Sequence, residues 1–169
     1  MATTNDKKIT ENPQKEKSTD ELDEILESTH IRQIGKFLKE NADSMRDEER
    51  PFTQYMREMI RGKKLKQQDV FLGADIPEKY GYKLISGEKR TKQRDVILRI
   101  CYAARFSLAE TQRALKMYDM PALYSKSRRD AVLMIAFNER PGKEIFDVDK
   151  LLMQYGMEPL RTVGAGSEE

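Results

Sequence analysis

The stretch KLKQQDVFLGADIPEKYGYKLISGEKR, residues 64–90, decides how the rest of this chain folds. It predicts one short helix over 67–73 and a second over 77–85. Apolar residues of the second helix share one face at helical spacing: Tyr80, Leu84 and Ile85. Pro77 suits a first helical turn, because its missing N–H would have no partner there. Gly87 suits the left-handed residue that follows a helix end, so we expect two short helices joined by a tight turn.

Helical patterns continue on both sides of this stretch. Residues 91–106 carry apolar side chains at helical spacing, and we expect Cys101 to be a buried structural thiol among them. Ser107 and Glu110 fit a capping box that starts the next helix. The same signals predict further helices over 53–62, 127–139 and 147–155. They also predict helix over 20–40 with Asp20 as its N-cap, either as one helix or interrupted at Ser28-Thr29-His30, in which case Ser28 or Thr29 would cap a second helix. No segment alternates like a strand, so the predicted fold class is all-α.

The helices suggest five segments along the chain. Residues 1–19 contain one large aliphatic side chain beyond Met1, so they cannot offset their ordering entropy, and we expect them to be disordered. The closing residues are rich in Gly and Ser and are expected to fray. The predicted order is a disordered segment (1–19), an N-terminal helical segment with its connector (20–50), a helix-turn-helix domain (51–118), a C-terminal helical extension (119–160) and a flexible tail (161–169).

Composition excludes several classes of protein. No apolar run is long enough for a membrane span and the N-terminus lacks a signal-peptide core, so we expect no membrane partner and a soluble, cytoplasmic protein. One Cys and one His allow neither an internal disulfide nor a His/Cys metal cluster, and no cofactor is predicted. The chain has no Gly-rich phosphate loop and no recognised catalytic motif. We therefore expect that it is not an enzyme and has no catalytic or metal residues.

Positive charge is concentrated on the central stretch. Residues 61–94 contain ten Lys or Arg and four Asp or Glu, a local charge of +6 in a chain of +2, which leaves −4 for the remainder. A positive field focused on one motif favours a polyanionic partner. Two short helices joined by a tight turn form the unit that sets its second helix into the major groove of DNA. The sequence therefore indicates double-stranded DNA as the partner.

The central stretch also resembles a known family. The residues that carry the resemblance are Gln67 at the start of the first helix, Ala74 before the turn, Ile76 leading into the second helix, the run Ser86-Gly87-Glu88-Lys89-Arg90, and SLAETQRAL over 107–115. They are similar to the phage-repressor (XRE/Cro-type) helix-turn-helix family, in a bacterial subgroup with a helical C-terminal extension. The resemblance covers about residues 50–160. It implies a repressor-like bundle and a sequence-specific regulator of transcription that binds palindromic DNA as a homodimer.

The resemblance implies roles for individual residues. Residues of the second helix would meet base edges: Glu78, Lys79 and Lys83. Residues at the start of the first helix and beyond the second would contact phosphates: Gln67, Ser86, Lys89 and Arg90. Tyr82, beside Lys79 and Lys83, is a further candidate for a phosphate or sugar contact, and the alternative is an ordinary surface tyrosine.

Three residues depart from the family pattern and keep a second interpretation open. Glu78 is acidic and would repel phosphate, although it can accept from the N4 amine of cytosine. Gly81 lies inside the second helix, where it costs about 1 kcal/mol relative to Ala. Pro77 replaces the usual Ser or Thr cap. The alternative is therefore a non-catalytic adaptor, in which the helix-turn-helix scaffold binds a signalling or regulatory protein.

Overall fold

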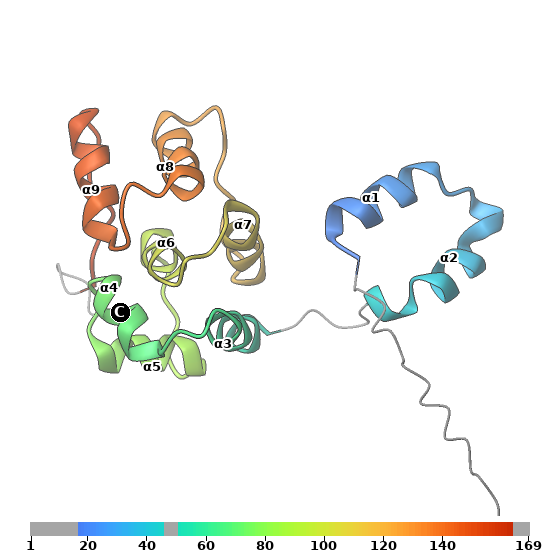
Figure 1. Cartoon of the computed structure of the whole chain (residues 1–169), viewed down its shortest axis with the longest axis horizontal. Helices are drawn as coiled ribbons and strands as arrows, with labels where there is room; N and C mark the ends of the chain where they lie inside the picture. Colours follow the sequence, from blue (N-terminus) through green and yellow to red (C-terminus); the bar gives the residue numbers. More distant parts are fainter. Residues whose placement is uncertain (1–16, 46–50, 164–169) are drawn as a thin grey trace, which may run out of the picture. The chain divides into compact units, whose positions relative to one another are not determined.

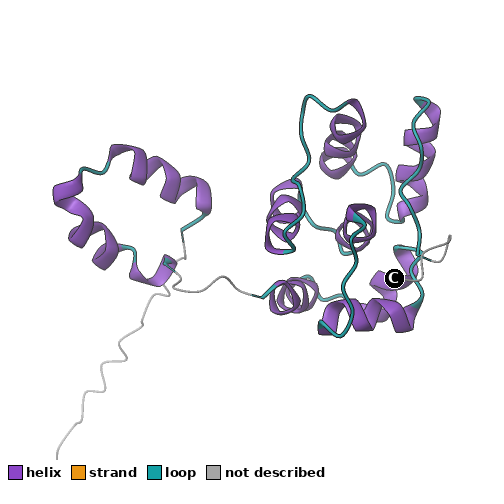
Figure 2. Ribbon diagram, turned by 180° about the vertical axis from the view of Figure 1, so that it is seen from behind, coloured by secondary structure: helices purple, strands orange, loops and turns teal. Residues whose placement is uncertain are grey.

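The computed structural model describes residues 17–45 and 51–163 of the chain (Figure 1). These residues fall into two compact units, one within 1–49 and the other within 50–169, and each is described by itself. Helices build both units, and the described residues contain no strand (Figure 2). The predicted all-α class is confirmed.

The N-terminal unit, residues 17–45, contains four helices, and the body, residues 51–163, contains seven. Those of the N-terminal unit are α1 (Thr19–Ser28), η1 (Ile31–Gln33), α2 (Ile34–Glu40) and η2 (Ala42–Ser44), of which η1 and η2 are 3-10 helices. Those of the body are α3 (Phe52–Gly62), α4 (Gln67–Gly73), α5 (Glu78–Ser86), α6 (Arg94–Ala103), α7 (Leu108–Met117), α8 (Arg128–Glu139) and α9 (Ile145–Gln154).

Polar contacts at its two ends hold the N-terminal unit. The Ser18 hydroxyl accepts from the Glu21 N–H at 3.2 Å, and the Glu21 carboxylate accepts from the Ser18 N–H at 2.7 Å. This capping box makes Ser18 the N-cap, so the prediction of Asp20 as the cap was wrong. Lys17 donates to Asn41 Oδ1 and to Ser44 Oγ, which joins the beginning of the unit to its end. Most of the predicted disordered segment lies outside the described residues, and its last two residues are the N-cap Ser18 and Thr19, the first residue of α1.

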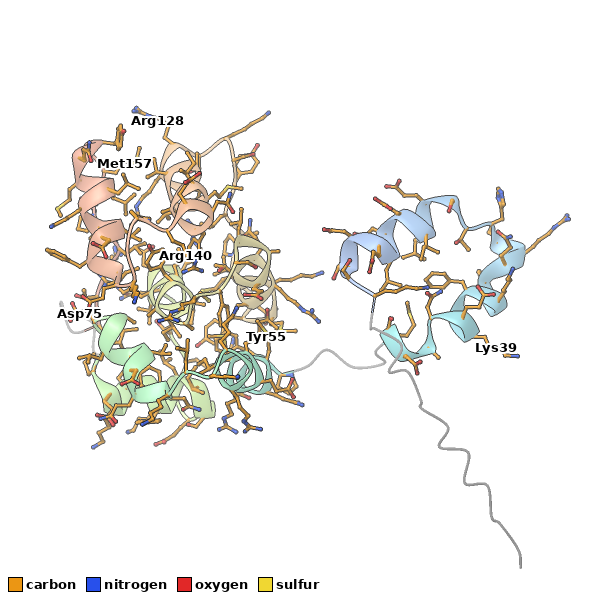
Figure 3. The ribbon with its side chains drawn as sticks, in the orientation of Figure 1. Lys39, Tyr55, Asp75, Arg128, Arg140 and Met157 are labelled. Carbon is orange, nitrogen blue, oxygen red and sulfur yellow. The ribbon has the colours of Figure 1, made fainter. Side chains whose placement is uncertain are left out.

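One hydrophobic core holds the body together. It contains 29 buried hydrophobic residues, contributed by all seven helices and by the connecting loops. In Figure 3 side chains fill the spaces between the ribbons of the body. The central helix is α6, in which seven consecutive residues, 96–102, are buried, among them Cys101 as expected. A helix buried on every side needs neighbours all round, and α6 packs against α4, α7 and α9.

A buried arginine on α6 ties the C-terminal part of the body to the turn between α4 and α5. The Arg99 side chain is 1% exposed and donates to the Ala74 carbonyl at 3.1 Å. It also donates to Asp149 Oδ2 on α9 at 3.0 Å, and to the Leu160 and Arg161 carbonyls. The group is therefore paired with a carboxylate, and each of its three nitrogens donates a hydrogen bond, as a buried charge requires.

The predicted C-terminal extension shares the core of the predicted helix-turn-helix domain. Leu133 and Phe137 of α8, with Val148 and Leu152 of α9, belong to the same cluster of buried residues as α3–α7. The division into a domain (51–118) and an extension (119–160) stays a prediction. Arg161 was predicted to begin the flexible tail, yet its N–H donates to Asp95 Oδ2 at 2.9 Å.

Helix ends follow the prediction to within a few residues. The first motif helix, α4, has the predicted bounds, and α5 begins and ends one residue later than predicted. The helix predicted over 91–106 is shorter and spans Arg94–Ala103. Its first predicted residue, Thr91, belongs to the loop before α6, where its N–H donates to the Tyr118 hydroxyl at 2.8 Å. The Ser107 capping box is confirmed. Within the described residues, no helix has the length and apolar character needed to cross a membrane.

Candidate nucleic-acid interface

The two motif helices pack against each other through an aromatic ring and a glycine. Val70 and Phe71 are the buried residues of α4, and Gly81, Leu84 and Ile85 are those of α5. A Cβ atom placed on Gly81 would lie 2.5 Å from atoms of the Phe71 ring. Gly81 therefore allows a close approach of the two helices that no larger residue permits. Its place inside the helix has a structural cause.

The second motif helix ends as predicted. Gly87 has φ +81°, the left-handed conformation, and its N–H donates to the Leu84 carbonyl. The Lys89 N–H donates to the Lys83 carbonyl at 3.1 Å. The end of α5 and the loop that follows are thus fixed by the backbone, which holds the side chains of the last helical turn in defined positions.

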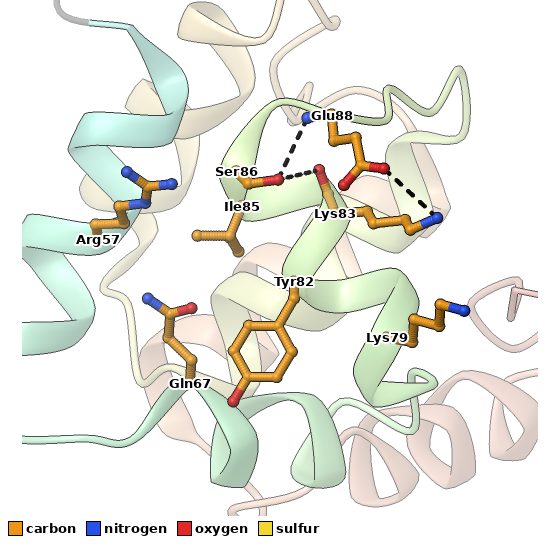
Figure 4. A pocket seen from close by; sticks show the side chains of 8 residues that line it. All are labelled: Arg57, Gln67, Lys79, Tyr82, Lys83, Ile85, Ser86 and Glu88. Carbon is orange, nitrogen blue, oxygen red and sulfur yellow. Dashed lines mark hydrogen bonds and ion pairs between the residues drawn. The ribbon is translucent and has the colours of Figure 1, made fainter.

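One face of α5 is polar and exposed, opposite the buried face. Lys79, Tyr82, Lys83 and Ser86 follow one another at i, i+3, i+4 and i+7, the spacing of a single helical stripe. Together with residues of α3, α4 and the loop after α5, they line a shallow cavity of about 350 Å³ (Figure 4). The lining residues are Arg57, Gln67, Lys79, Tyr82, Lys83, Ile85, Ser86 and Glu88. Five of the eight predicted DNA-binding residues therefore lie together.

The cavity is positively charged. Arg57, Lys79 and Lys83 contribute three cations and Glu88 one anion. Lys83 Nζ lies 3.6 Å from a Glu88 carboxylate oxygen, and the Ser86 hydroxyl accepts from the Glu88 N–H at 3.3 Å. Ser86 Oγ also donates to the Lys83 carbonyl at 3.1 Å. Glu88 is thereby positioned to neutralise one of the three cations (Figure 4).

Tyr82 points outward, and its ring packs against the ring of Phe71. It is 42% exposed, whereas Tyr80 is partly buried against the core. The Tyr82 ring meets the Phe71 ring edge-on, with centroids 5.0 Å apart. An aromatic ring held in this way presents a rigid surface to a partner.

Three predicted residues do not line the cavity. Glu78 is exposed, and its carboxylate accepts from the Gln68 side-chain amide at 3.4 Å. Lys89 lies over the Tyr80 ring, 5.3 Å from its centroid. Arg90 stacks on Tyr118, with its guanidinium carbon 4.5 Å from the ring centroid, and donates to the Tyr118 carbonyl. A cation held on a ring in this way supports the fold of the α5–α6 loop.

Arg57 was missed at the sequence level. It lies on α3, on the exposed side opposite Met56 and Ile60, and reaches the cavity because α3 packs against α5. Arg57 and Arg61 flank one another at i, i+4 on the polar face of an amphipathic helix, which was the available signal. The pattern alone does not indicate which element these arginines lie beside, because that depends on how α3 packs.

No family model, curated protein or solved structure matches this chain. Within residues 17–45 and 51–163 no group of three or more His, Cys, Asp or Glu could hold a metal ion. The case for a function therefore depends on the cavity and on the helix that lines it.

Proposed function

We propose that this chain is a non-catalytic, sequence-specific DNA-binding regulator of transcription that places α5 in the major groove. The observation that supports this most directly is the exposed stripe Lys79, Tyr82, Lys83 and Ser86 on a helix whose other face is buried. The major groove of B-DNA is about 12 Å wide and accepts one α-helix. A short helix that protrudes with cations toward solvent has the shape and charge for this docking.

The cations of the cavity divide into two roles in this proposal. Lys79 and Lys83, on the helix, would donate to the O6 and N7 atoms of guanine. Arg57, on the neighbouring α3, would contact a phosphate, together with Gln67 and Ser86. Glu78, at the start of α5, would accept from the N4 amine of a cytosine. Lys89 and Arg90 would contribute to the field at the phosphates from their places on Tyr80 and Tyr118.

Substituting both helix lysines tests the proposal. We expect Lys79→Ala/Lys83→Ala to lose about 100-fold or more in affinity for a duplex selected from a random pool, because each good base contact contributes about 1–3 kcal/mol. Lys116→Ala/Lys126→Ala removes the same charge from exposed positions outside the cavity and serves as the control. Fluorescence anisotropy gives the affinities, and far-UV circular dichroism checks that the helices remain.

Arg57 separates phosphate contacts from base contacts. We expect Arg57→Ala to weaken binding to selected and random duplexes alike, and to reduce the slope of log affinity against log salt by about 0.9. A loss confined to the selected duplex would assign Arg57 to the bases instead. If the wild-type chain has no salt-sensitive affinity for any duplex, the proposal is wrong.

Removing the ion pair between Lys83 and Glu88 should change the affinity for DNA in the opposite direction to the lysine and arginine substitutions. We expect Glu88→Gln to strengthen binding to all duplexes, because the substitution removes a negative charge from the cavity and releases Lys83. Anisotropy titrations at low and high salt measure the gain, which should shrink at high salt. An unchanged affinity at low salt would show that Glu88 does not face the DNA.

Leu72 favours the alternative function, an adaptor that binds a signalling or regulatory protein. It lies on α4 within the motif and is 80% exposed, although a large apolar side chain gains by burial against a partner. Absence of DNA binding, combined with a protein partner whose affinity falls in Leu72→Asp and not in Lys79→Ala/Lys83→Ala, would support the adaptor.

A further inference from the structure

The N-terminal unit lacks a core that could hold it together. Of its described residues, 17–45, one hydrophobic side chain is buried, Phe37, at 8% exposure. Four large aliphatic side chains are exposed by about half or more: Leu26 (48%), Ile31 (86%), Ile34 (51%) and Leu38 (51%). They lie on α1, η1 and α2. A helix of this length owes its stability to burial of its apolar face, so these faces require a partner.

The apolar residues form stripes that suit helix packing. Leu22, Ile25 and Leu26 follow one another along α1 at i, i+3 and i+4, and Ile34 and Leu38 are separated by one turn along α2. Leu22 and Ile25 are partly buried within the unit, whereas Leu26, Ile34 and Leu38 are about half exposed. Each stripe therefore keeps an exposed edge that another helix can cover, Leu26 on α1 and Ile34 with Leu38 on α2.

Charge identifies the partner. Helix α1 contains five acidic residues and no basic one: Asp20, Glu21, Asp23, Glu24 and Glu27. Residues 31–40 contain Arg32, Lys36 and Lys39 against one acid, Glu40. Lys39 is exposed and points away from the rest of the unit (Figure 3). One stripe therefore has a negative border and the other a positive border, and each matches the other in a second molecule.

We infer that the N-terminal unit is a dimer interface, in which α1 of one copy packs against α2 of a second copy of this chain. A two-fold axis makes both contacts equivalent, and each then joins a negative helix to a positive one. The alternative pairing of α1 with α1 would place five acids opposite five acids, so electrostatics selects the crossed arrangement. This deepens the proposed function, because two copies are what a palindromic site requires, and its tests contain no DNA.

Light scattering coupled to size exclusion tests the apolar contact on the full chain. We expect wild-type protein to have the mass of two chains at roughly 0.1 mM, and Leu26→Asp/Leu38→Asp to have the mass of one. Ile135→Asp/Phe146→Asp makes the same change at residues of the body that are equally exposed, 59% and 57%, and should remain dimeric. A monomeric wild type, or a control variant that becomes monomeric, would overturn the inference.

Charge exchange tests the crossed pairing without touching the apolar stripes. Asp23→Lys/Glu24→Lys/Glu27→Lys gives α1 three Lys against two acids and makes it positive, and Arg32→Glu/Lys39→Glu makes residues 31–40 negative while the Lys36–Glu40 ion pair stays in place. We expect each variant to be monomeric alone, because both contacts of its dimer would join like charges. Mixed together, they should form a dimer in which both contacts are attractive again.

The mixture distinguishes a second copy from packing within one chain. Intramolecular packing of α1 on α2 would be damaged in each variant, and mixing could not repair it. A mixture that stays monomeric, or variants that dimerise alone as wild type does, would contradict the crossed pairing. A dimer that binds no DNA would support this interface and overturn the proposed function. A chain that binds DNA but stays monomeric would support the proposed function and overturn this interface.

Discussion

The two units of this chain stabilise their helices in different ways. The body buries 29 hydrophobic residues in one cluster, whereas the N-terminal unit buries Phe37 alone. The body also buries charged groups, Arg99 and Asp130, each held by several hydrogen bonds. The N-terminal unit depends on a capping box and the contacts of Lys17, whereas the body has the Ser107 capping box in addition to its core. Local signals are enough to start a helix, and tertiary burial is what gives it stability.

The same difference separates what each unit can do. A rigid body can hold Lys79, Tyr82 and Lys83 on a fixed stripe, as a site that reads base edges requires. A unit with exposed apolar stripes gains stability when a partner covers them. Under the two proposals the body would serve recognition and the N-terminal unit association. The structural contrast beneath them can be tested by substitutions with opposite expectations.

The largest effect is expected from the buried arginine of the body. Arg99→Met leaves Asp149 and the Ala74, Leu160 and Arg161 carbonyls without their donor, and should lower the free energy of unfolding by about 3–5 kcal/mol. Urea denaturation followed by circular dichroism measures the loss. Arg128→Met, at an exposed position of α8, is the control and should stay within about 0.5 kcal/mol of wild type. Equal effects of the two substitutions would show that the hydrogen bonds of Arg99 do not stabilise the body.

A glycine substitution on α5 should have the next largest effect. The Cβ of Gly81→Ala would meet the Phe71 ring at 2.5 Å, and the helices must then separate. We expect a destabilisation of about 1–3 kcal/mol, as for other overpacked cores, measured by urea denaturation. Phe71→Leu in the same chain should recover part of the loss of Gly81→Ala. Additive losses would show that the ring and the glycine are not in contact.

The same substitution in the N-terminal unit should have the opposite sign. Gly35 lies within α2, and nothing would lie within 4 Å of an added Cβ. Gly35→Ala should therefore stabilise α2 by about 1 kcal/mol, the difference in helix propensity between the two residues. Far-UV circular dichroism should show an increase in helical signal, while the urea midpoint of the body stays unchanged. A loss of helical signal would place Gly35 in a packed environment and weaken the contrast between the units.

Features set by local chemistry could be predicted from the sequence. The bounds of α4, the left-handed Gly87 and the Ser107–Glu110 capping box depend on residues a few positions apart, and each agrees with the structure. The buried position of Cys101 was also predicted, because an apolar stripe is itself a local pattern.

Features set by the packing of distant segments could not be predicted in this way. Leu98, Arg99 and Tyr102 lie off the apolar stripe of α6, and they are buried because α6 is enclosed by α4, α7 and α9. Arg57 joins the candidate site through the packing of α3 against α5. Arg90 is held on Tyr118, 28 residues further along the chain. None of these pairings has a signal within one helix, so the sequence could not predict that Arg57 lines the cavity beside α5 or that Arg90 is held away from it.

The smallest effect expected is a pH dependence that reports on the body alone. Burial raises the pKa of the Cys101 thiol far above its usual range, Glu110 adds to the rise, and a hydrogen bond with Thr111 opposes it. The folded chain therefore keeps this proton at a pH where an unfolded thiol, with a pKa of about 8.5, loses it. Because the folded state then binds more protons, stability is complete below pH 8.5 and falls as the pH rises above it.

Cys101→Ala should remove this dependence. Between pH 7 and pH 9 the wild-type chain should lose about 0.8 kcal/mol of unfolding free energy more than Cys101→Ala does, as measured by urea denaturation. Cys101 is the single cysteine of the chain, so a thiol reagent should label the folded protein only at the rate at which the body opens. Leu26→Asp/Leu38→Asp in the N-terminal unit should leave that rate unchanged, whereas Gly81→Ala in the body should raise it. Labelling accelerated by the N-terminal substitutions would mean that the two units unfold together. That result would contradict the view that each unit is stabilised separately.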